Sequence, residues 1–301
     1  MSVFFACLVA LVLNLSHRLP LWLTPKTYVI GWAQRLEAHF NTPAGRAWRS
    51  HGATAWLIVI TPFVALLWLA EQLPYLGWVI DVLVLCWALE LGSIKTRVIA
   101  LIAALKNDDL TAAKQQLEPV VAQRLDALDQ QGVAKVSTEW VLKDGVYTVL
   151  AVLFWFVIFG PMGAAIYRLS HGLNRLWGHR DQRFIRFGWA SAKLFEALAF
   201  IPTRVAAFSF ALLGKTRLAF ACWREQASLW PSPNAGVILA SGAGALNVRL
   251  GGPAQYASWE EPRCDLGGEH APNAVSLDHA LNLVYQSIGL WLLLIGLWMF
   301  F

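Results

Sequence analysis

The chain has 301 residues, of which 57% are hydrophobic and only 14% are charged. Soluble domains carry about 25% charged residues, so this composition argues against a soluble globular protein. The sixteen tryptophans agree with that conclusion, because tryptophan concentrates at bilayer interfaces. The net charge of +5 comes without a basic tail or a nucleic-acid module, so we expect contact with anionic lipid or anionic ligands and no nucleic-acid partner.

The cysteines and histidines show no metal-site spacing. Four cysteines are scattered without a CxxC pair, and the seven histidines form neither HxxxH nor HExxH. Cysteine in an apolar run behaves as a small hydrophobic residue. We therefore expect neither a disulfide framework nor a structural metal bound by the protein.

The N-terminal third alternates apolar and basic segments. Val3–Leu15 is predicted to be a retained apolar anchor, because it lacks the basic start and the cleavage site of a signal peptide. After the basic segment 16–51, Ala53–Ala70 and Leu73–Leu91 are each long enough to span a membrane and predict a hairpin. Pro62 is expected to kink the first of these two spans.

Residues 92–143 read as a soluble helical insertion. Asn107 or Asp108 is expected to cap a helix that ends near Leu117. Val121–Leu128 is predicted to continue as a short helix. The insertion thus predicts a helical loop outside the membrane.

The second half returns to apolar segments. Val146–Tyr167 is a predicted span with an interruption at Gly160–Pro161. Pro253–Asn273 is predicted to be a loop, and Ser276 to cap a last helix that ends in the span Leu281–Phe301. We therefore predict an all-α, polytopic integral membrane protein with a single domain, 1–301, about four to six membrane helices and cytoplasmic helical loops.

Basic loops indicate the topology. The segments 16–51, 92–145 and 171–204 all carry excess lysine and arginine, which favours one cytoplasmic face for the three. That arrangement requires Val146–Tyr167 to enter the membrane and return on the same side. A single crossing would instead put one basic loop on the opposite side, and the sequence leaves both paths open.

The most charged stretch of the chain is Gly178–Arg204. If it is helical, Arg183, Arg186, Ala190 and Lys193 share one face beside an apolar stripe. Such a helix suits a membrane–water boundary. The same pattern is typical of a positively charged loop that anchors topology.

A glycine-rich segment follows at 242–253. Glycines allow backbone N–H groups to approach a phosphate closely, and the guanidinium of Arg249 could add a bidentate hydrogen-bond donor. The alternative is a small-residue face for helix packing that ends in a turn at Gly251–Gly252–Pro253.

Three blocks of the sequence resemble the CobD/CbiB family, the adenosylcobinamide-phosphate synthases. The first holds Glu139, Asp144 and Gly145, and the third holds Asn234–Gly236 with Arg249–Pro253. The second block, GHRDQRFIRFGWASAKLFEALAFIPTR at its centre, matches at Tyr167, Asn174, Gly178, Arg180, Arg183, Gly188, Trp189, Pro202 and Arg204.

The resemblance covers the chain from about Gly92 to the end. The Gly-Asp-Pro and His-Pro-Val motifs of the family's N-terminus are absent, and Phe195 replaces one of two acidic residues, which leaves Glu196.

The resemblance implies a reaction and a set of site residues. The reaction is ATP-dependent amide formation between adenosylcobyric acid and an amino alcohol phosphate, with ATP and Mg²⁺ as cofactors. Implied catalytic residues are Glu139, Asp144 and Asn234, the last as an oxyanion donor. Mg²⁺ would be held by Glu139, Asp144 and Glu196. Substrate and phosphate binding is implied for Arg180, Arg183, Arg186, Trp189, Arg204, Gly236, Arg249, Gly251 and Gly252.

The resemblance also bears on surroundings and partners. It implies a multi-pass protein of the bacterial inner (cytoplasmic) membrane with functional loops in the cytoplasm. Its partners would be the corrinoid substrate, the amino alcohol phosphate, membrane lipid and other membrane proteins of the late cobalamin pathway. A more distant likeness to the AmpE family leaves a non-catalytic inner-membrane regulator as the alternative, and a structural membrane protein as a third class.

Overall fold

The computed structural model describes residues 2–16, 26–41, 49–73, 76–178, 183–256 and 259–300. Helices make up most of this described chain, and its four strands are two or three residues long. The predicted all-α class is confirmed. Two compact units form, each discontinuous in sequence: unit 1 comprises residues 1–90 and 151–200, and unit 2 comprises 91–150 and 201–301. The single domain stays a prediction.

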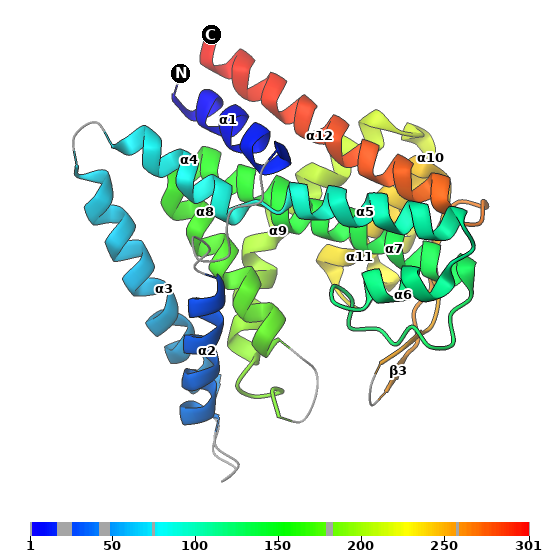
Figure 1. Ribbon diagram of the computed structural model, residues 1–301, viewed down its shortest axis with the longest axis horizontal. Helices are drawn as coiled ribbons and strands as arrows, with labels where there is room; N and C mark the ends of the chain where they lie inside the picture. Colours follow the sequence, from blue (N-terminus) through cyan, green and yellow to red (C-terminus); the bar gives the residue numbers. More distant parts are fainter. Residues whose placement is uncertain are drawn as a thin grey trace. The chain divides into compact units, whose positions relative to one another are not determined.

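Unit 1 is built from helices of both halves of the chain. Within it α4 packs on α1 and α8, and α3 packs on α2 and α8 (Figure 1). A buried cluster that includes Val59, Leu173, Trp177 and Phe187 forms its core. The helices are α1 (Ser2–Ser16), α2 (Lys26–Phe40), α3 (Arg49–Glu71), α4 (Gly77–Ala88), α8 (Ala151–Trp177) and the part of α9 (Trp189–Leu213) up to Phe200.

Unit 2 combines a helical layer with short antiparallel strands. Helix α12 packs on α5 and α7, and α11 packs on α7 and α10. Its helices are α5 (Leu91–Lys106), α6 (Leu110–Leu117), α7 (Gln130–Gly145), a π-helical turn (Val146–Leu150), the rest of α9, α10 (Thr216–Gln226), a 3-10 turn (Ala227–Leu229), α11 (Pro233–Leu246) and α12 (Ala274–Phe300).

Three of the four strands of unit 2 lie inside Pro253–Asn273, the segment predicted as a loop, and β1 lies just before it. Strand β1 (Arg249–Gly251) pairs with β4 (Asp265–Gly267), and Gly251 stands opposite Asp265. Strand β2 (Ala254–Gln255) pairs with β3 (Glu260–Glu261). The loop prediction therefore missed two small ribbons, whose strands are too short to produce a period-2 pattern.

Five helical stretches in the described chain are long and apolar enough to cross a membrane, which agrees with the predicted four to six. They are Arg49–Glu71, Gly77–Lys106, Gln130–Trp177, Trp189–Leu213 and Ala274–Trp298. The chain is a membrane protein.

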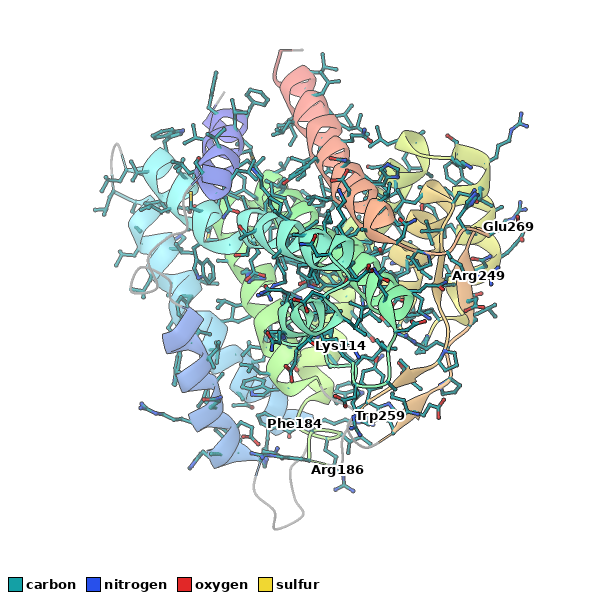
Figure 2. The ribbon with its side chains drawn as sticks, turned by 45° about the vertical axis from the view of Figure 1, so that its right-hand side comes forward. Lys114, Phe184, Arg186, Arg249, Trp259 and Glu269 are labelled. Atoms are coloured by element: carbon teal, nitrogen blue, oxygen red, sulfur yellow. The ribbon has the colours of Figure 1, made fainter. Side chains whose placement is uncertain are left out.

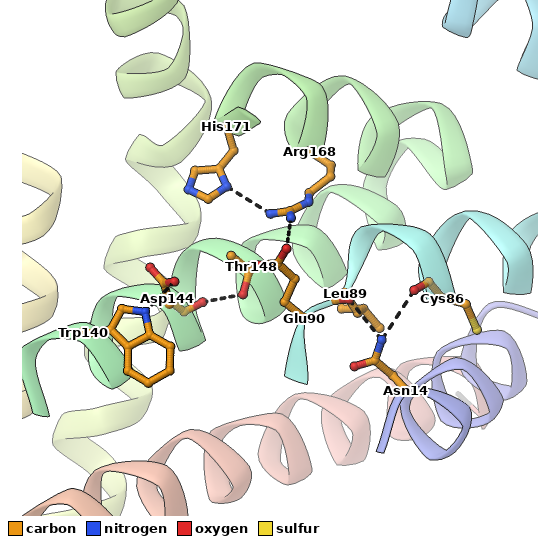
Figure 3. Close-up of polar contacts among 9 residues, drawn as sticks. All are labelled: Asn14, Cys86, Leu89, Glu90, Trp140, Asp144, Thr148, Arg168 and His171. Atoms are coloured by element: carbon orange, nitrogen blue, oxygen red, sulfur yellow. Dashed lines mark hydrogen bonds and ion pairs between the residues drawn. The ribbon is translucent and has the colours of Figure 1, made fainter. Parts of the chain in front are cut away.

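The second predicted span, Leu73–Leu91, overlaps the stretch Gly77–Lys106, which is interrupted at residues 89–90. Helix α4 ends at Ala88, where the last carbonyls of a helix lack partners inside it. The Asn14 side chain supplies these partners, because its Nδ2 donates to Leu89 O at 3.0 Å and to Cys86 O at 3.4 Å (Figure 3). Helix α4 thus ends where Asn14 of α1 can hydrogen-bond its unpaired carbonyl groups.

Several predicted helix limits shift because individual hydrogen bonds, some between distant residues, decide where the helices begin and end. Residues 121–128 are not helical; instead the N–H of Arg124 donates to Gln255 O at 2.8 Å. The cap of α6 is Asp109, one residue later than predicted. Asn273 caps α12 in place of Ser276, because its Oδ1 accepts from the N–H groups of the second and third helical residues.

Of the two interpretations left open for Gly178–Arg204, the helix does not form over 183–188. Residues 183–188 form turns, and α9 begins at Trp189. A Cβ at Gly188 would lie 1.6 Å from Trp177 O, and a Cβ at Gly52 would lie 1.9 Å from Phe187 O. This close backbone packing holds the turn, so Arg183 and Arg186 do not share a helical face with Lys193.

The predicted interruption of the span at Gly160–Pro161 is confirmed. Phe159 and Gly160 leave helical geometry, and Gly160 has a φ of +62°, which glycine tolerates. Helix geometry then resumes up to Trp177. The re-entrant path itself stays a prediction.

We expect Gly188→Ala to lower the free energy of unfolding by about 1–3 kcal/mol, because the new methyl group would displace backbone. The measurement is the thermal midpoint in detergent. Gly172→Ala is the matched control, because nothing lies within 4 Å of its Cβ position. Equal midpoints for the two variants would contradict the close packing described above.

Candidate functional site around Glu139

Glu139 is a buried carboxylate in the middle of α7. Asp129 starts this helix by accepting the N–H of Gly132 at 2.7 Å. Glu139 is only 1% exposed. Its Oε1 accepts the N–H of Gly251 at 2.8 Å, and its Oε2 lies 3.6 Å from Arg263 Nη1. A charge this deeply buried is tolerated because it is paired and hydrogen-bonded.

Arg263 is the partner that holds this carboxylate. It precedes β4 and is 8% exposed. Its Nε donates to Gly252 O at 2.9 Å, and its guanidinium lies 4.8 Å from the centre of the Trp230 ring. Arg263 therefore joins the carboxylate, the glycine turn and an aromatic face. Sequence reasoning missed it, because a single arginine in a loop-like segment has no distinguishing spacing.

The Gly251–Gly252 turn requires glycine at both positions. Their φ angles are +83° and +77°, and a Cβ at Gly251 would lie 2.3 Å from Cys264 O. The N–H of Gly251 donates to Glu139, and that of Gly252 donates to Cys264 O at 3.0 Å. Both donors are thus used within the chain. The phosphate-binding role of these glycines stays a prediction. It would depend on the space that a missing side chain leaves for a phosphate, and not on hydrogen bonds from these two N–H groups.

Lys135 brings a cation to the same turn. A Cβ at Gly252 would lie 3.3 Å from Lys135 Nζ and 3.1 Å from Asp265 Oδ1. Lys135 precedes Glu139 by four residues, so the two lie on one face of α7. Lys135 is half-buried and makes no hydrogen bond or ion pair with the described part of the chain. It was not among the predicted residues.

Arg204 and Asn234 form a second polar pair in unit 2. Arg204 Nη1 donates to Asn234 Oδ1 at 2.6 Å and to Thr203 Oγ1 at 3.2 Å. Asn234 is 4% exposed. Two residues later, a Cβ at Gly236 would lie 2.8 Å from Trp230 Cβ. A Cβ at Gly251 would lie 3.1 Å from Trp230 Cζ3, so Trp230 lies next to both Gly236 and Gly251.

The Asp144 side chain lies on a different side of α7 from that of Glu139. Five residues along α7 correspond to a rotation of about 140°. Asp144 Oδ2 accepts from Trp140 Nε1 at 2.8 Å, and its backbone carbonyl accepts from Thr148 Oγ1 at 2.7 Å (Figure 3). The two carboxylates predicted for Mg²⁺ thus point to different sides of the helix.

Arg249 lies on β1, two residues before Gly251. Its N–H donates to His270 O at 2.8 Å, and its exposed side chain lies on the outside of unit 2 (Figure 2). Arg249 is exposed, whereas Leu250 and Gly251 are buried. Its predicted phosphate role is untested.

Other predicted residues belong to unit 1. Arg183 donates through Nε and Nη2 to the Glu37 carboxylate at 3.0 and 2.9 Å. Glu37 is 7% exposed, so this arginine neutralises a buried charge of α2. Arg186 is exposed (Figure 2). Arg180 lies outside the described residues.

The remaining two predicted residues lie on α9. Trp189 stacks under Arg49, whose guanidinium lies 4.6 Å from the ring centre. Glu196 pairs with Lys193 at 2.8 Å, and both side chains are substantially exposed. In the described residues, no three histidine, cysteine, aspartate or glutamate side chains are grouped to hold a metal ion.

Tyr256 lies beside the buried pair. Its hydroxyl is 3.5 Å from Glu261 Oε2, and its ring stacks on Trp259 with centroids 4.9 Å apart. Burial is the main cause that raises the pKa of Tyr256 above its ordinary value, with the Glu261 and Glu139 carboxylates adding to it and Arg263 opposing it. The phenol is therefore protonated at neutral pH and can donate.

Fold and site together define a class of protein. It is a polytopic helical membrane protein in which a buried carboxylate–arginine pair, a glycine turn and a half-buried lysine occupy one region of unit 2. Such a region is suited to an anionic ligand, because Lys135, which pairs with no residue of the described chain, lies next to a glycine turn that leaves room for a ligand.

Comparison with known proteins gives the family. Residues 7–284 match the family described as "CobD/Cbib protein". The chain is 44% identical over 302 residues to a "Cobalamin biosynthesis protein CobD" of Stutzerimonas stutzeri, which covers 100% of both chains. Proteins with the same description from Chromobacterium violaceum and Rhodobacter capsulatus are 37% and 33% identical, covering 81% and 91% of this chain and 78% and 88% of their own. The chain belongs to the CobD/CbiB family. No solved structure matches it.

The match extends the predicted resemblance and decides between the alternatives. We expected it to begin near Gly92, whereas it begins at residue 7 and includes the N-terminal helices. The AmpE-like regulator is not favoured, because the relatives are named as cobalamin biosynthesis proteins.

We expect Glu139→Gln and Arg263→Met each to lower the free energy of unfolding by about 3–5 kcal/mol, because each leaves one buried polar partner without its counter-charge. The double variant should cost less than the sum. Unfolding in detergent by denaturant measures all three.

The control cycle uses Arg124 and Asp126, whose ion pair is 2.9 Å long but 60% and 77% exposed. Each change there should cost under about 1 kcal/mol. Additive effects at Glu139 and Arg263 would show that the pair is not coupled.

Proposed function

We propose that unit 2 holds the site at which this chain makes adenosylcobinamide phosphate. The chain acts in cobalamin biosynthesis as an adenosylcobinamide-phosphate synthase, the ligase activity of its family. The reaction joins a corrinoid carboxylate to the amine of an amino alcohol phosphate. The observation that supports the location is the bond from Gly251 N–H to Glu139, because it joins two of the three family blocks.

Lys135 and Arg249 are proposed to bind the phosphate of the amino alcohol phosphate. Lys135 Nζ lies at the Gly252 turn, and Arg249 is an exposed residue of β1 two residues before Gly251. Hydrogen bonds to charged groups contribute about 1.5–3 kcal/mol. The planar guanidinium of Arg249 can donate two parallel hydrogen bonds to the phosphate, whereas the ammonium of Lys135 acts as a point charge.

Asn234 is proposed to stabilise the oxyanion that forms when the amine attacks the corrinoid carboxyl carbon. Arg204 holds the Oδ1 of Asn234, which turns the NH₂ group of the amide to the other side. A donor fixed before the reaction costs no reorganisation when charge develops. Arg204 is thus a positioning residue.

ATP and Mg²⁺ are proposed as the further requirements. Hydroxide is a poor leaving group, so ATP would supply the activation that a carboxylate needs. Mg²⁺ usually binds through one or two carboxylates together with substrate phosphates. Asp144 fits that role better than Glu139, whose two oxygens face Gly251 and Arg263, or Glu196, which faces Lys193.

The cellular setting is part of the proposal. We propose the bacterial inner membrane, with the basic segments on the cytoplasmic side, where ATP is present. Contact with other membrane proteins of the late pathway stays a prediction.

The test is synthesis by the full chain in detergent. Given adenosylcobyric acid, ATP, Mg²⁺ and aminopropanol phosphate or ethanolamine phosphate, the protein should form an amide-linked product detected by mass spectrometry. Lys135→Gln and Arg249→Lys should raise the KM for the amino alcohol phosphate about 10-fold or more. Arg124→Lys, an exposed control, should leave the KM unchanged.

Asp144→Asn tests the metal role separately. We expect weaker binding of ADP with Mg²⁺ by calorimetry, and no change in ADP binding without Mg²⁺. Product formation at full rate by Lys135→Gln and Arg249→Lys would place the phosphate site elsewhere. Absence of product with either amino alcohol phosphate would overturn the reaction.

A further inference from the structure

Helix α10 presents a face that the proposed reaction does not use. It starts three residues after α9, whose apolar stretch is long enough to span a membrane. Ala219 and Cys222 are buried, and a Cβ at Gly244 of α11 would lie 2.8 Å from Ala219 Cα. Small residues thus fix one side of α10 against α11, and the other side faces outward.

The outward side is a groove of aromatic rings. The Phe220 ring stacks on Trp223 with centroids 6.2 Å apart and lies 5.8 Å from Phe208 of α9. The groove has a volume of about 720 Å³. It is lined by Phe208, Thr216, Arg217, Phe220, Ala221, Trp223 and Arg224.

Two arginines stand at the rim of this groove. Arg217 and Arg224 are seven residues apart and therefore lie on one face of the helix. Arg217 makes no ion pair or hydrogen bond with the described residues. Arg224 lies 3.3 Å from Glu225, but both side chains are mostly exposed, so that pair neutralises it weakly.

The groove is continuous with the apolar surface of α9. Phe208 and Leu212 are 48% and 50% exposed on the last turns of that helix. At the end of a membrane span, arginine and tryptophan side chains lie at headgroup depth. Acyl chains reach the same depth from the bilayer side, and lipid phosphates lie just outside it.

We propose that this groove binds an anionic phospholipid. The guanidinium groups of Arg217 and Arg224 hold the lipid phosphate, and an acyl chain lies against Phe208, Phe220 and Trp223. The commitment to lipid and not to a free phosphate rests on the aromatic lining and on its continuity with α9. The site is separate from Glu139 and its neighbours and does not depend on the proposed reaction.

Native mass spectrometry of the full chain in detergent tests the proposal. Titration with phosphatidylglycerol should give a bound lipid at lower concentration than titration with phosphatidylcholine. Each arginine near an anionic headgroup contributes about fivefold. The double variant Arg217→Gln/Arg224→Gln should therefore weaken phosphatidylglycerol binding about 25-fold, and Arg217→Lys/Arg224→Lys should keep most of it.

Two controls make the result specific. Arg124→Gln removes an exposed arginine of the same unit away from the groove and should leave binding unchanged. Trp223→Ala should weaken phosphatidylglycerol and phosphatidylcholine equally, because it removes the acyl contact. Equal affinity for the two lipids, or retention of phosphatidylglycerol by the double Gln variant, would overturn the proposal. Displacement of the lipid by glycerol phosphate at the same concentration would show a free-phosphate site instead.

Discussion

Burial of the Glu139 carboxylate is the constraint on which the arrangement of unit 2 depends. An ionised carboxylate in an apolar helix is costly unless an opposite charge and hydrogen-bond donors surround it. The C-terminal half of the chain supplies both, because Arg263 provides the charge and Gly251 provides the N–H. The tight Gly251–Gly252 turn and the close approach of Trp230 follow from bringing these two partners to α7.

Unit 1 contains two further carboxylates that are paired with arginine. At the end of α4, the Glu90 carboxylate accepts from Arg168, which is 9% exposed, and Arg168 Nη1 lies 3.1 Å from His171 Nδ1 (Figure 3). Near the turn before α9, Glu37 accepts from Arg183. Two buried or half-buried carboxylates of unit 1 are thus each paired with an arginine inside the protein.

Composition and periodicity were sufficient for the class of fold. Apolar length predicts the spans, and the Gly160–Pro161 interruption follows from backbone chemistry alone. The helix considered for the start of Gly178–Arg204 does not form over 183–188, because carbonyl contacts at Gly52 and Gly188 favour turns there. The contact between Gly52 and Phe187 joins segments more than a hundred residues apart, so no local pattern records it.

The site was predictable only in part, for a related reason. Family blocks single out Glu139 and Gly251, which a hydrogen bond joins, and Asn234, which accepts from Arg204. Arg263, Trp230 and Lys135 carry no motif of their own. Their place in the site can be identified only from the folded structure, where they lie beside the buried carboxylate and the glycine turn.

Hydrogen–deuterium exchange is the most direct test that the Glu139–Arg263 pair holds the glycine turn. Amide exchange would be compared between the full chain in detergent and its Arg263→Met variant. The account predicts faster exchange in peptides covering 249–252 and 263–267, with unchanged exchange in α2 and α3 of unit 1. Unchanged exchange across 249–252 would contradict the claim, because the turn would then be held without the pair.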